Sequence, residues 1–475
     1  MTNKKENSLI AYNAVIQIIG RIFFLALSLV NVKLITNYLL PSGFGEYATV
    51  LTFTGFFTVL IDLGLFHVAI REISKARERA QEILSNVLTI RLLSAVLATL
   101  LVIFLGYALP QYRPIGTGIL VGALAMFVYF VTNILDVVFH VNLKMQYIAV
   151  AELVSKISTL IAVYVAIVLD WGLVGIIGAI LFGSVVAVLP RVIIARRFIQ
   201  LKLAFDPKIC VWLLKLALPL GLVFILNNIY FKIDSQMLYL LSTTRDAGLY
   251  GIAYRLLETT LFISAFVVAA ITPSLSRTIG SNTKVAQNLV SRAFEILLAA
   301  GLLLFVSLSI FAKPIIVFIS DTSYIEGARA VPMLAAVVAL MYVNGLFGQI
   351  LIAADRRKIL VTFSIILVLF NIGLNLILIP RYGFIGAAWS TLISELGVLI
   401  FNLIVTSKIM PLKLNMRTIL VILLATTLST LIFISLDGLF NWLIVLILGF
   451  IFYLGILWQF KFLNLSMMKE IIRKE

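Results

Sequence analysis

Long apolar segments recur along the whole chain and constrain its fold more than any other feature. Many of them approach the roughly 20 residues that an α-helix needs to cross about 30 Å of hydrocarbon. Hydrophobic residues make up 62% of the sequence and charged residues 12%, whereas soluble chains are about half apolar and a quarter charged. The segments are continuously apolar, unlike the short alternating strands of a membrane barrel. The sequence therefore predicts an all-α polytopic membrane protein.

Charge spacing and turn residues divide the apolar sequence into about 14 transmembrane helices. The first is expected to be retained, because it is followed by Pro41 and lacks the short apolar core and small-residue cleavage site of a signal peptide. The helices are expected near residues 10–40, 44–65, 87–109, 115–140, 148–169, 172–190, 212–241, 247–272, 293–318, 329–353, 359–379, 384–406, 418–436 and 439–460.

Basic residues gather in alternate connections between these helices, in runs such as "REISKARER", "RVIIARRFIQLK" and "DRRK". The intervening connections hold only Arg113, Arg245 and Arg381. Lysine and arginine concentrate in cytoplasmic loops, so the pattern predicts a protein of the cell membrane with both termini in the cytoplasm. We read the net charge of +16 mainly as a mark of this topology and expect no nucleic-acid partner.

The chain also contains a weak internal repeat. Residues 18–40 align with residues 219–241, and after a two-residue insertion Gly45 aligns with Gly248. A second stretch sets "DWGLVG" on "RYGFIG", with Gly172 on Gly383. The copies begin six expected helices apart, so both should enter the membrane in the same direction, as in transporters built from parallel repeats. We expect a six-helix lobe over residues 1–205, a second over 206–410, and two additional helices with a tail over 411–475.

Several polar and charged residues fall inside expected membrane helices. Each Lys, Arg or Asp near the bilayer centre costs about 2.5–3.5 kcal/mol, while a Leu or Ile returns only about 0.3–0.6 kcal/mol. Such groups usually line a watery cavity or pair with one another. From their depths we expect Asp234 to lie near Arg255 and Lys232 near Glu258. We predict a substrate cavity lined by Arg21, Asn31, Lys33, Asn228, Lys232, Asp234, Arg255 and Glu258.

A second polar cluster lies toward the cytoplasmic side of the first lobe. Asp136 and His140 are four residues apart on one helix, and Glu152 and Lys156 are four apart on the next. Asp136, Glu152 and Lys156 are candidates for ion coupling or for a cytoplasmic gate, while His140 reads as an interfacial residue. Weaker polar marks in the second lobe are Asn344, Gln349, Asn371, Asn375 and Glu395. Of these, Asn344, Asn371 and Asn375 read mainly as helix packing.

Signatures of catalysis and of metal or cofactor binding are missing from the sequence. We find no phosphate-cradling loop with its lysine and no HExxH, and the connections are too short for a nucleotide-binding domain. Cys210 is the one cysteine, and neither His67 nor His140 has a metal-binding spacing. We therefore expect a transporter rather than an enzyme, with no cofactor and no metal site.

An ordered set of motifs over roughly residues 8–410 resembles the polysaccharide flippases. Their superfamily also holds multidrug extruders and the lipid II flippase. The stretch "NNIYFKIDSQMLYLLSTTRDAGLYGIAYRL" is similar to helices 7 and 8 of these flippases. The other matching stretches are "LLPSGFGEY", "DLGLFHVAIREIS", "ITPSLSR", "ILIAADRRK" and "YGFIGAAWST".

The resemblance implies a V-shaped pair of six-helix lobes that alternates between inward-facing and outward-facing states. Its substrate would be an oligosaccharide attached through pyrophosphate to a polyprenol, carried from the inner to the outer leaflet while the lipid tail leaves between helices 1 and 8. The cationic residues Arg21, Lys33, Lys232 and Arg255 are the candidates for holding the pyrophosphate or acidic sugars. Expected partners are membrane lipids and a polysaccharide polymerase or glycosyltransferases, with the transporter itself a monomer.

Three alternatives remain open from the sequence. A cation-coupled multidrug antiporter of the same superfamily would have an acidic cavity, and the mixed, Lys/Arg-rich set here favours an anionic substrate instead. Lipid II is another candidate cargo. A membrane-embedded transferase acting on lipid-linked sugars would be expected to carry a large extracytoplasmic loop, which the sequence does not show.

Overall fold

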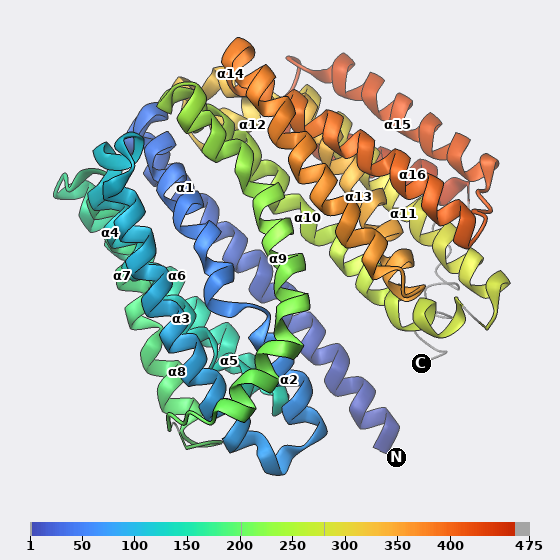
Figure 1. Cartoon of the computed structure of the whole chain (residues 1–475). Helices are drawn as coiled ribbons and strands as arrows, with labels where there is room; N and C mark the ends of the chain where they lie inside the picture. Colours follow the sequence, from blue (N-terminus) through green and yellow to red (C-terminus); the bar gives the residue numbers. More distant parts are fainter. Residues whose placement is uncertain (1, 201, 280, 461–475) are drawn as a thin grey trace. The chain divides into compact units, whose positions relative to one another are not determined.

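The computed structural model describes residues 2–200, 202–279 and 281–460, and their side chains from residue 24 onward except at residues 220 and 357. Regular structure in this part is helical apart from an isolated bridge between Asp437 and Phe440 (Figure 1). In chain order the α-helices are α1 (Thr2–Asp62), α2 (Leu65–Lys75), α3 (Ala80–Ala108), α4 (Gly116–Asn133), α5 (Asp136–Val141), α6 (Met145–Val168), α7 (Gly172–Val186), α8 (Val188–Ala195), α9 (Pro207–Leu241), α10 (Thr244–Thr278), α11 (Thr283–Ile310), α12 (Ala312–Ile319), α13 (Val331–Ala353), α14 (Arg357–Ile409), α15 (Met416–Leu436) and α16 (Trp442–Gln459). Short 3-10 helices cover Arg77–Arg79, Pro110–Ile115 and Thr322–Arg329.

Eleven of the described helical segments are long and apolar enough to cross a membrane, and the bent helix α9 makes a twelfth. Two of the eleven, Phe24–Lys75 and Lys358–Ile409, are each 52 residues long, whereas one crossing needs only about 20 residues. Within these segments, α1 and α14 each contain one residue with a non-helical backbone, Leu40 and Gly383 respectively. The predicted polytopic helical membrane fold is confirmed.

The break at Leu40 follows from the residue after it. Leu40 has a φ of 57°, and Pro41 has no N–H to continue the helical hydrogen bonds. Proline also disfavours the helical conformation in the residue before it. The sequence predicted two helices with a gap at residues 41–43. Instead, helical geometry resumes at once, and α1 continues beyond the kink.

The aligned glycines of the repeat meet in space. A Cβ on Gly45 would lie 1.8 Å from the carbonyl oxygen of Thr244, and a Cβ on Gly248 would lie 1.9 Å from that of Pro41. The two repeated segments, helical at both glycines, therefore pack backbone against backbone, and only glycine fits at either position. This contact fixes the start of α10 against the kink of α1.

The second aligned pair of glycines shares a positive φ. Gly172 has a φ of 61° at the start of α7, and Gly383 has a φ of 55° at the break in α14. Glycine adopts positive φ readily because it has no Cβ. The shared sign of φ is consistent with the repeat alignment, although the domain boundaries that the alignment suggests stay a prediction.

The chain divides by packing into two compact units. The N-terminal unit comprises Met1–Gly251 with Ile319–Asp321, and the C-terminal unit comprises Ile252–Phe318 with Thr322–Glu475. In the N-terminal unit α1, α3, α4, α6 and α7 pack together and α9 runs along α1 (Figure 1). A hydrophobic core of α2, α3, α5 and the first turns of α9 fills its end and buries Cys210.

The C-terminal unit is built around α11, α13 and α14, with α15 and α16 packed together and α15 against α11. The Tyr453 hydroxyl of α16 donates to the carbonyl oxygen of Ala299 on α11 at 2.9 Å. The ring of Phe433 on α15 packs so close to Gly449 that a Cβ there would lie 2.0 Å from it. The two last helices are thus part of the core of this unit.

Many large apolar side chains point out of both units. Leu97 and Phe104 on α3 are 68% and 66% exposed, and Leu420 and Ile451 on α15 and α16 are each 62% exposed. In water this much exposed apolar surface would be unfavourable, by about 25 cal/mol for each Å². In a membrane these faces contact lipid.

Candidate functional site

Polar side chains of α9 pack along α1 inside the N-terminal unit. The amide Nδ2 of Asn228 donates to the carbonyl oxygen of Gly55 at 3.0 Å and lies 3.5 Å from the Thr58 hydroxyl. Lys232, one turn further along α9, brings its Nζ to 2.5 Å from the position that a Cβ on Gly55 would occupy. The absence of a side chain at Gly55 therefore makes room for the lysine.

Further along α9, two polar residues are held by tyrosines. Asp234 is 2% exposed, and its Oδ2 accepts a hydrogen bond from the Tyr250 hydroxyl at 3.1 Å. Gln236 is also buried, and its Nε2 donates to the Tyr112 hydroxyl at 2.8 Å. The Tyr112 ring stacks on that of Tyr239 at 5.6 Å. These contacts fix the carboxylate and the amide in place within the N-terminal unit.

The three predicted residues of α1 are placed less fully. Arg21 lies in α1, but its side chain is outside the described residues. Lys33 is exposed, and Asn31 is half-buried. The side-chain oxygens of Asn31 and Asn228 are buried and accept no hydrogen bond from the described residues. Buried amide oxygens usually have a donor, so these two are exceptions among the polar atoms of the described residues.

Arg255 and Glu258 belong to the C-terminal unit, on α10. Their side chains form an ion pair with 3.1 Å between Nη1 and Oε2 and are 39% and 44% exposed. The sequence identified both residues and their one-turn spacing. The predicted pairings of Asp234 with Arg255 and of Lys232 with Glu258 stay predictions.

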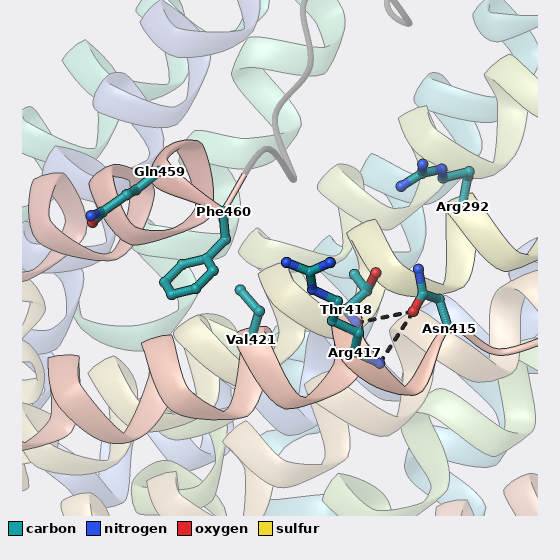
Figure 2. A pocket seen from close by; sticks show the side chains of 7 residues that line it. All are labelled: Arg292, Asn415, Arg417, Thr418, Val421, Gln459 and Phe460. Atoms are coloured by element: carbon teal, nitrogen blue, oxygen red, sulfur yellow. Dashed lines mark hydrogen bonds between the residues drawn. The ribbon is translucent and has the colours of Figure 1, made fainter.

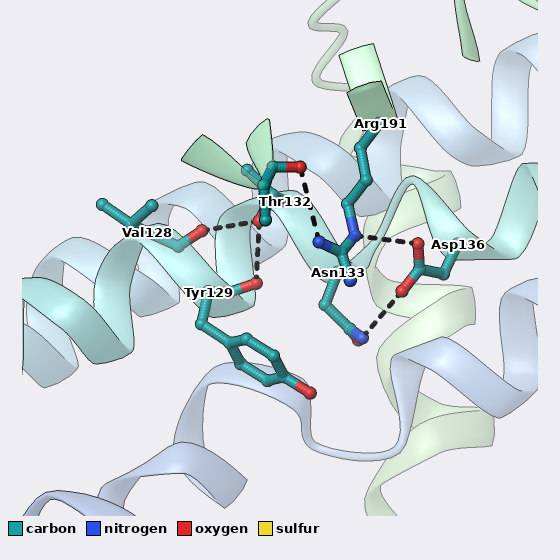
Figure 3. A network of polar contacts seen from close by, with 7 residues as sticks. Val128, Tyr129, Thr132, Asn133, Asp136 and Arg191 are labelled. Carbon is teal, nitrogen blue, oxygen red and sulfur yellow. Dashed lines mark hydrogen bonds and ion pairs between the residues drawn. The ribbon is translucent and has the colours of Figure 1, made fainter. Parts of the chain in front are cut away.

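The candidate gate residue Asp136 lies in a buried polar network (Figure 3). Its Oδ1 pairs with Nε of Arg191 on α8 at 3.1 Å, and its Oδ2 accepts from the Asn133 amide at 3.2 Å. Arg191 also lies 3.4 Å from the carbonyl oxygen of Ala187. The side chains of Arg191 and Asp136 are 4% and 3% exposed. A buried pair needs such extra hydrogen bonds to offset the cost of removing two charges from water.

The position of Arg191 corrects the sequence analysis. The run "RVIIARRFIQLK" was assigned to a basic cytoplasmic connection, whereas its first arginine lies buried inside the N-terminal unit. Arg196 and Arg197 of the same run are exposed, as expected. The helical repeat of about 3.6 residues places Arg191 on the buried face of α8 and leaves other positions exposed. Because α8 has only 8 residues, this repeat is hard to recognise in the sequence.

A second buried arginine was missed. Arg91 on α3 is 1% exposed and lies 3.3 Å from the Asp62 carboxylate at the end of α1. Its guanidinium stands over the Phe130 ring at 5.8 Å, and none of its three nitrogens makes a hydrogen bond with the described residues. The sequence did contain a signal for this contact. Arg91 lies inside an apolar segment, and Asp62 lies at the end of the apolar segment expected before it.

The other two gate candidates lie on the surface of α6. Glu152 and Lys156 are both exposed, whereas Asp136 is buried. Within the described residues no three His, Cys, Asp or Glu side chains gather closely enough to hold a metal ion.

A third polar network crosses the C-terminal unit between α13 and the two arms of α14. The Asn344 amide donates to the Glu395 carboxylate at 2.7 Å. The Asn371 amide approaches the hydroxyls of Ser390 and Ser394 at 3.4 and 3.3 Å, and Asn375 donates to Asn371 at 3.1 Å. The bonds of Asn344 and Asn371 join neighbouring helical segments, consistent with the packing role expected for the asparagines.

A bundle of apolar spanning helices with buried charge networks defines the class of a polytopic membrane transporter. Comparison with protein families then gives the family. The model of the polysaccharide biosynthesis protein family matches residues 10–279, and that of the MatE family matches residues 219–377. The first match covers more than half of the chain, so the protein belongs to the polysaccharide biosynthesis protein family. This confirms the resemblance seen in the sequence and the expectation of a transporter rather than an enzyme.

Solved structures share the fold at low sequence identity. The lipid II flippase MurJ in an inward closed conformation superimposes with a TM-score of 0.76 at 18% identity, over 93% of this chain and 97% of MurJ. An inward-facing multidrug resistance MATE family transporter of the MOP superfamily gives 0.68 at 14% identity, over 81% and 94%. The MATE multidrug transporter DinF-BH gives 0.56 at 18% identity, over 82% and 94%. A search of curated proteins gave no match.

Proposed function

We propose that this transporter flips a polyprenyl-pyrophosphate-linked oligosaccharide, the repeat unit of a polysaccharide, from the inner to the outer leaflet of the cell membrane by alternating access. The observation that carries the proposal is the family match over residues 10–279, which contains the polar residues of α1 and α9. These residues, here called the polar seam, are Asn31, Lys33, Asn228, Lys232 and Asp234. Hydroxyl groups cost several kcal/mol each in alkane-like surroundings, so a glycan needs polar partners to cross the membrane.

The seam supplies groups suited to such a substrate. Amide oxygens of Asn31 and Asn228 without a donor among the described residues can accept hydrogen bonds from sugar hydroxyls. Lys33 and Lys232 carry positive charge to the same pair of helices. We propose that these lysines, with Arg21 and Arg255, bind the pyrophosphate, and that Asp234 and Glu258 orient the cations or titrate during transport.

The finer architecture is part of the proposal. Splitting the two 52-residue spans at Leu40 and Gly383 brings the twelve candidate spans to about 14 crossings. We propose that these form two parallel six-helix lobes arranged in a V, residues 1–205 and 206–410, followed by the two helices of residues 411–475. Both termini are proposed to be cytoplasmic and the protein monomeric, with glycosyltransferases or a polysaccharide polymerase as partners.

Asp136 is the best-supported candidate for the coupling or gating group. Arg191 and Asn133 hold its carboxylate in a buried setting where protonation would break an ion pair. We propose that Glu152 and Lys156 on the exposed face of α6 belong to the same cytoplasmic gate.

One other function has an observation in its favour. The MatE family model matches residues 219–377, and multidrug MATE transporters share the fold, so a cation-coupled drug antiporter is the second candidate. The similarity to MurJ likewise keeps lipid II among the candidate substrates.

Transport by purified protein in liposomes tests the proposal. Vesicles would carry a polyprenyl-pyrophosphate oligosaccharide, lipid II, or an entrapped organic cation, and transfer or efflux would be timed with and without ion gradients. Faster leaflet transfer of the oligosaccharide lipid than of lipid II, with no cation efflux, is expected. Cation efflux without any lipid transfer would instead establish the antiporter.

A further inference from the structure

A cavity of about 420 Å³ lies in the C-terminal unit where α15 begins and α16 ends (Figure 2). Its lining comes from α11, α15 and the end of α16. Asn415, Arg417, Gln459 and Phe460 are exposed, so the cavity opens to the surface of the unit. None of these residues belongs to the proposed transport site.

Two arginines give the cavity its charge. Arg292 reaches it from α11 and Arg417 from α15 (Figure 2). One Nη of Arg292 pairs at 3.1 Å with Glu295, whose side chain is 3% exposed. A guanidinium has five N–H donors in a fixed fork, so this pairing orients Arg292 and leaves further donors for a ligand. Among the described residues that line the cavity, none is acidic.

The first turn of α15 does not supply the anion site. Asn415 caps this helix, and its Oδ1 accepts from the backbone N–H groups of Arg417 and Thr418 at 3.2 and 3.4 Å. These N–H groups are therefore already bonded. A negatively charged ligand would be held by the two guanidinium groups, which suit the geometry of phosphate oxygens.

The cavity also has an apolar side. Val421 and Phe460 line it, and the adjoining outer surface of α15 and α16 exposes Leu420 at 62% and Trp458 at 71%. A free phosphate ion would use only the arginines. A phospholipid would use both parts, with its phosphate between the guanidinium groups and its acyl chains along the exposed apolar side chains.

We propose that this cavity binds the phosphate headgroup of an anionic glycerophospholipid. The connections next to it are on the side predicted to face the cytoplasm, where the leaflet is rich in anionic lipid and each nearby Arg or Lys contributes about 1 kcal/mol. The bound lipid fastens α15 and α16 to α11 and is separate from any transported lipid.

Native mass spectrometry of the full chain tests the proposal, with dioleoyl phosphatidylglycerol as probe and dioleoyl phosphatidylcholine for comparison. Arg417→Gln, at an exposed position where folding should be unaffected, is expected to weaken phosphatidylglycerol binding about fivefold. Arg292→Gln should weaken it as well. Lys408→Gln, which removes an exposed charge outside the cavity, should leave it unchanged.

Three results would overturn the proposal. Equal binding of the two lipids by the natural protein would exclude recognition of the headgroup charge. The same loss in Lys408→Gln as in Arg417→Gln would show a general charge effect. Displacement of phosphatidylglycerol by millimolar inorganic phosphate would show a site for the free anion instead of the lipid.

Discussion

The pair of Asp136 and Arg191 should be one of the most sensitive points of the fold. Both side chains are almost fully buried, and 3.1 Å separates Nε from Oδ1. Removing one partner leaves a buried charge without compensation, which typically costs about 3–5 kcal/mol. We therefore expect Arg191→Gln and Asp136→Asn each to lose stability in that range.

A double-mutant cycle separates the pair from its surroundings. In the double variant neither charge remains, so we expect the loss to be smaller than the sum of the two single losses by about 2–3 kcal/mol. The free energy of unfolding would be measured by titrating the purified protein in mixed micelles with sodium dodecyl sulfate and following circular dichroism.

An exposed ion pair on the same unit provides the control. Arg79 and Glu82 lie 2.8 Å apart, but both are 45% exposed, so Arg79→Gln should cost less than about 1 kcal/mol. If Arg191→Gln costs no more than this control, or if the two single losses simply add, the reasoning about the buried pair is wrong.

Three further predictions concern steric fit and buried charge. Gly248→Ala places a Cβ against the carbonyl oxygen of Pro41 and should lower the free energy of unfolding by about 1–3 kcal/mol or more. Gly251→Ala is the control and should cost little, because the nearest atoms are 3.5 Å from its Cβ. In Gly55→Ala the new Cβ meets only the flexible end of Lys232, so the stability should stay close to that of Gly251→Ala. Transfer of the oligosaccharide lipid should fall, because Lys232 is displaced. Unchanged transfer would show that this contact has no part in the mechanism. Arg91→Met should cost clearly less than Arg191→Gln in the same unfolding assay, because the partner Asp62 is 19% exposed and the Arg91 guanidinium makes no hydrogen bonds with the described residues.

The sequence predicts the class of the fold because membrane helices are long and apolar. Each such helix can be recognised from its own residues, without knowing which helices pack against it. It also identifies the turn glycines. The alignment of Gly45 with Gly248 could not show that the two residues contact each other, since the distance between helices depends on packing. Nor does the pattern around Leu40 reveal that helical geometry resumes directly after the kink.

Individual charges are harder to place from sequence. Asp136 lies inside an apolar segment and can be predicted as a candidate. Its partner Arg191 cannot be distinguished in the sequence from the nearby arginines that are exposed. Lys232 and Asn228 were expected to line a substrate cavity, and the structure adds the contacts of both with Gly55, which has no polar side chain that could be noticed in the sequence.

Leaflet transfer by the Lys232→Gln variant tests the central claim most directly. The rate of oligosaccharide-lipid transfer would be measured in liposomes for the natural protein, for Lys232→Gln and for Lys413→Gln, which neutralises an exposed lysine outside the seam. We expect Lys232→Gln to lose most of the transfer and Lys413→Gln to retain it, at equal amounts of folded protein. Equal rates in all three proteins would contradict the claim that the cations of α1 and α9 carry the pyrophosphate across the membrane.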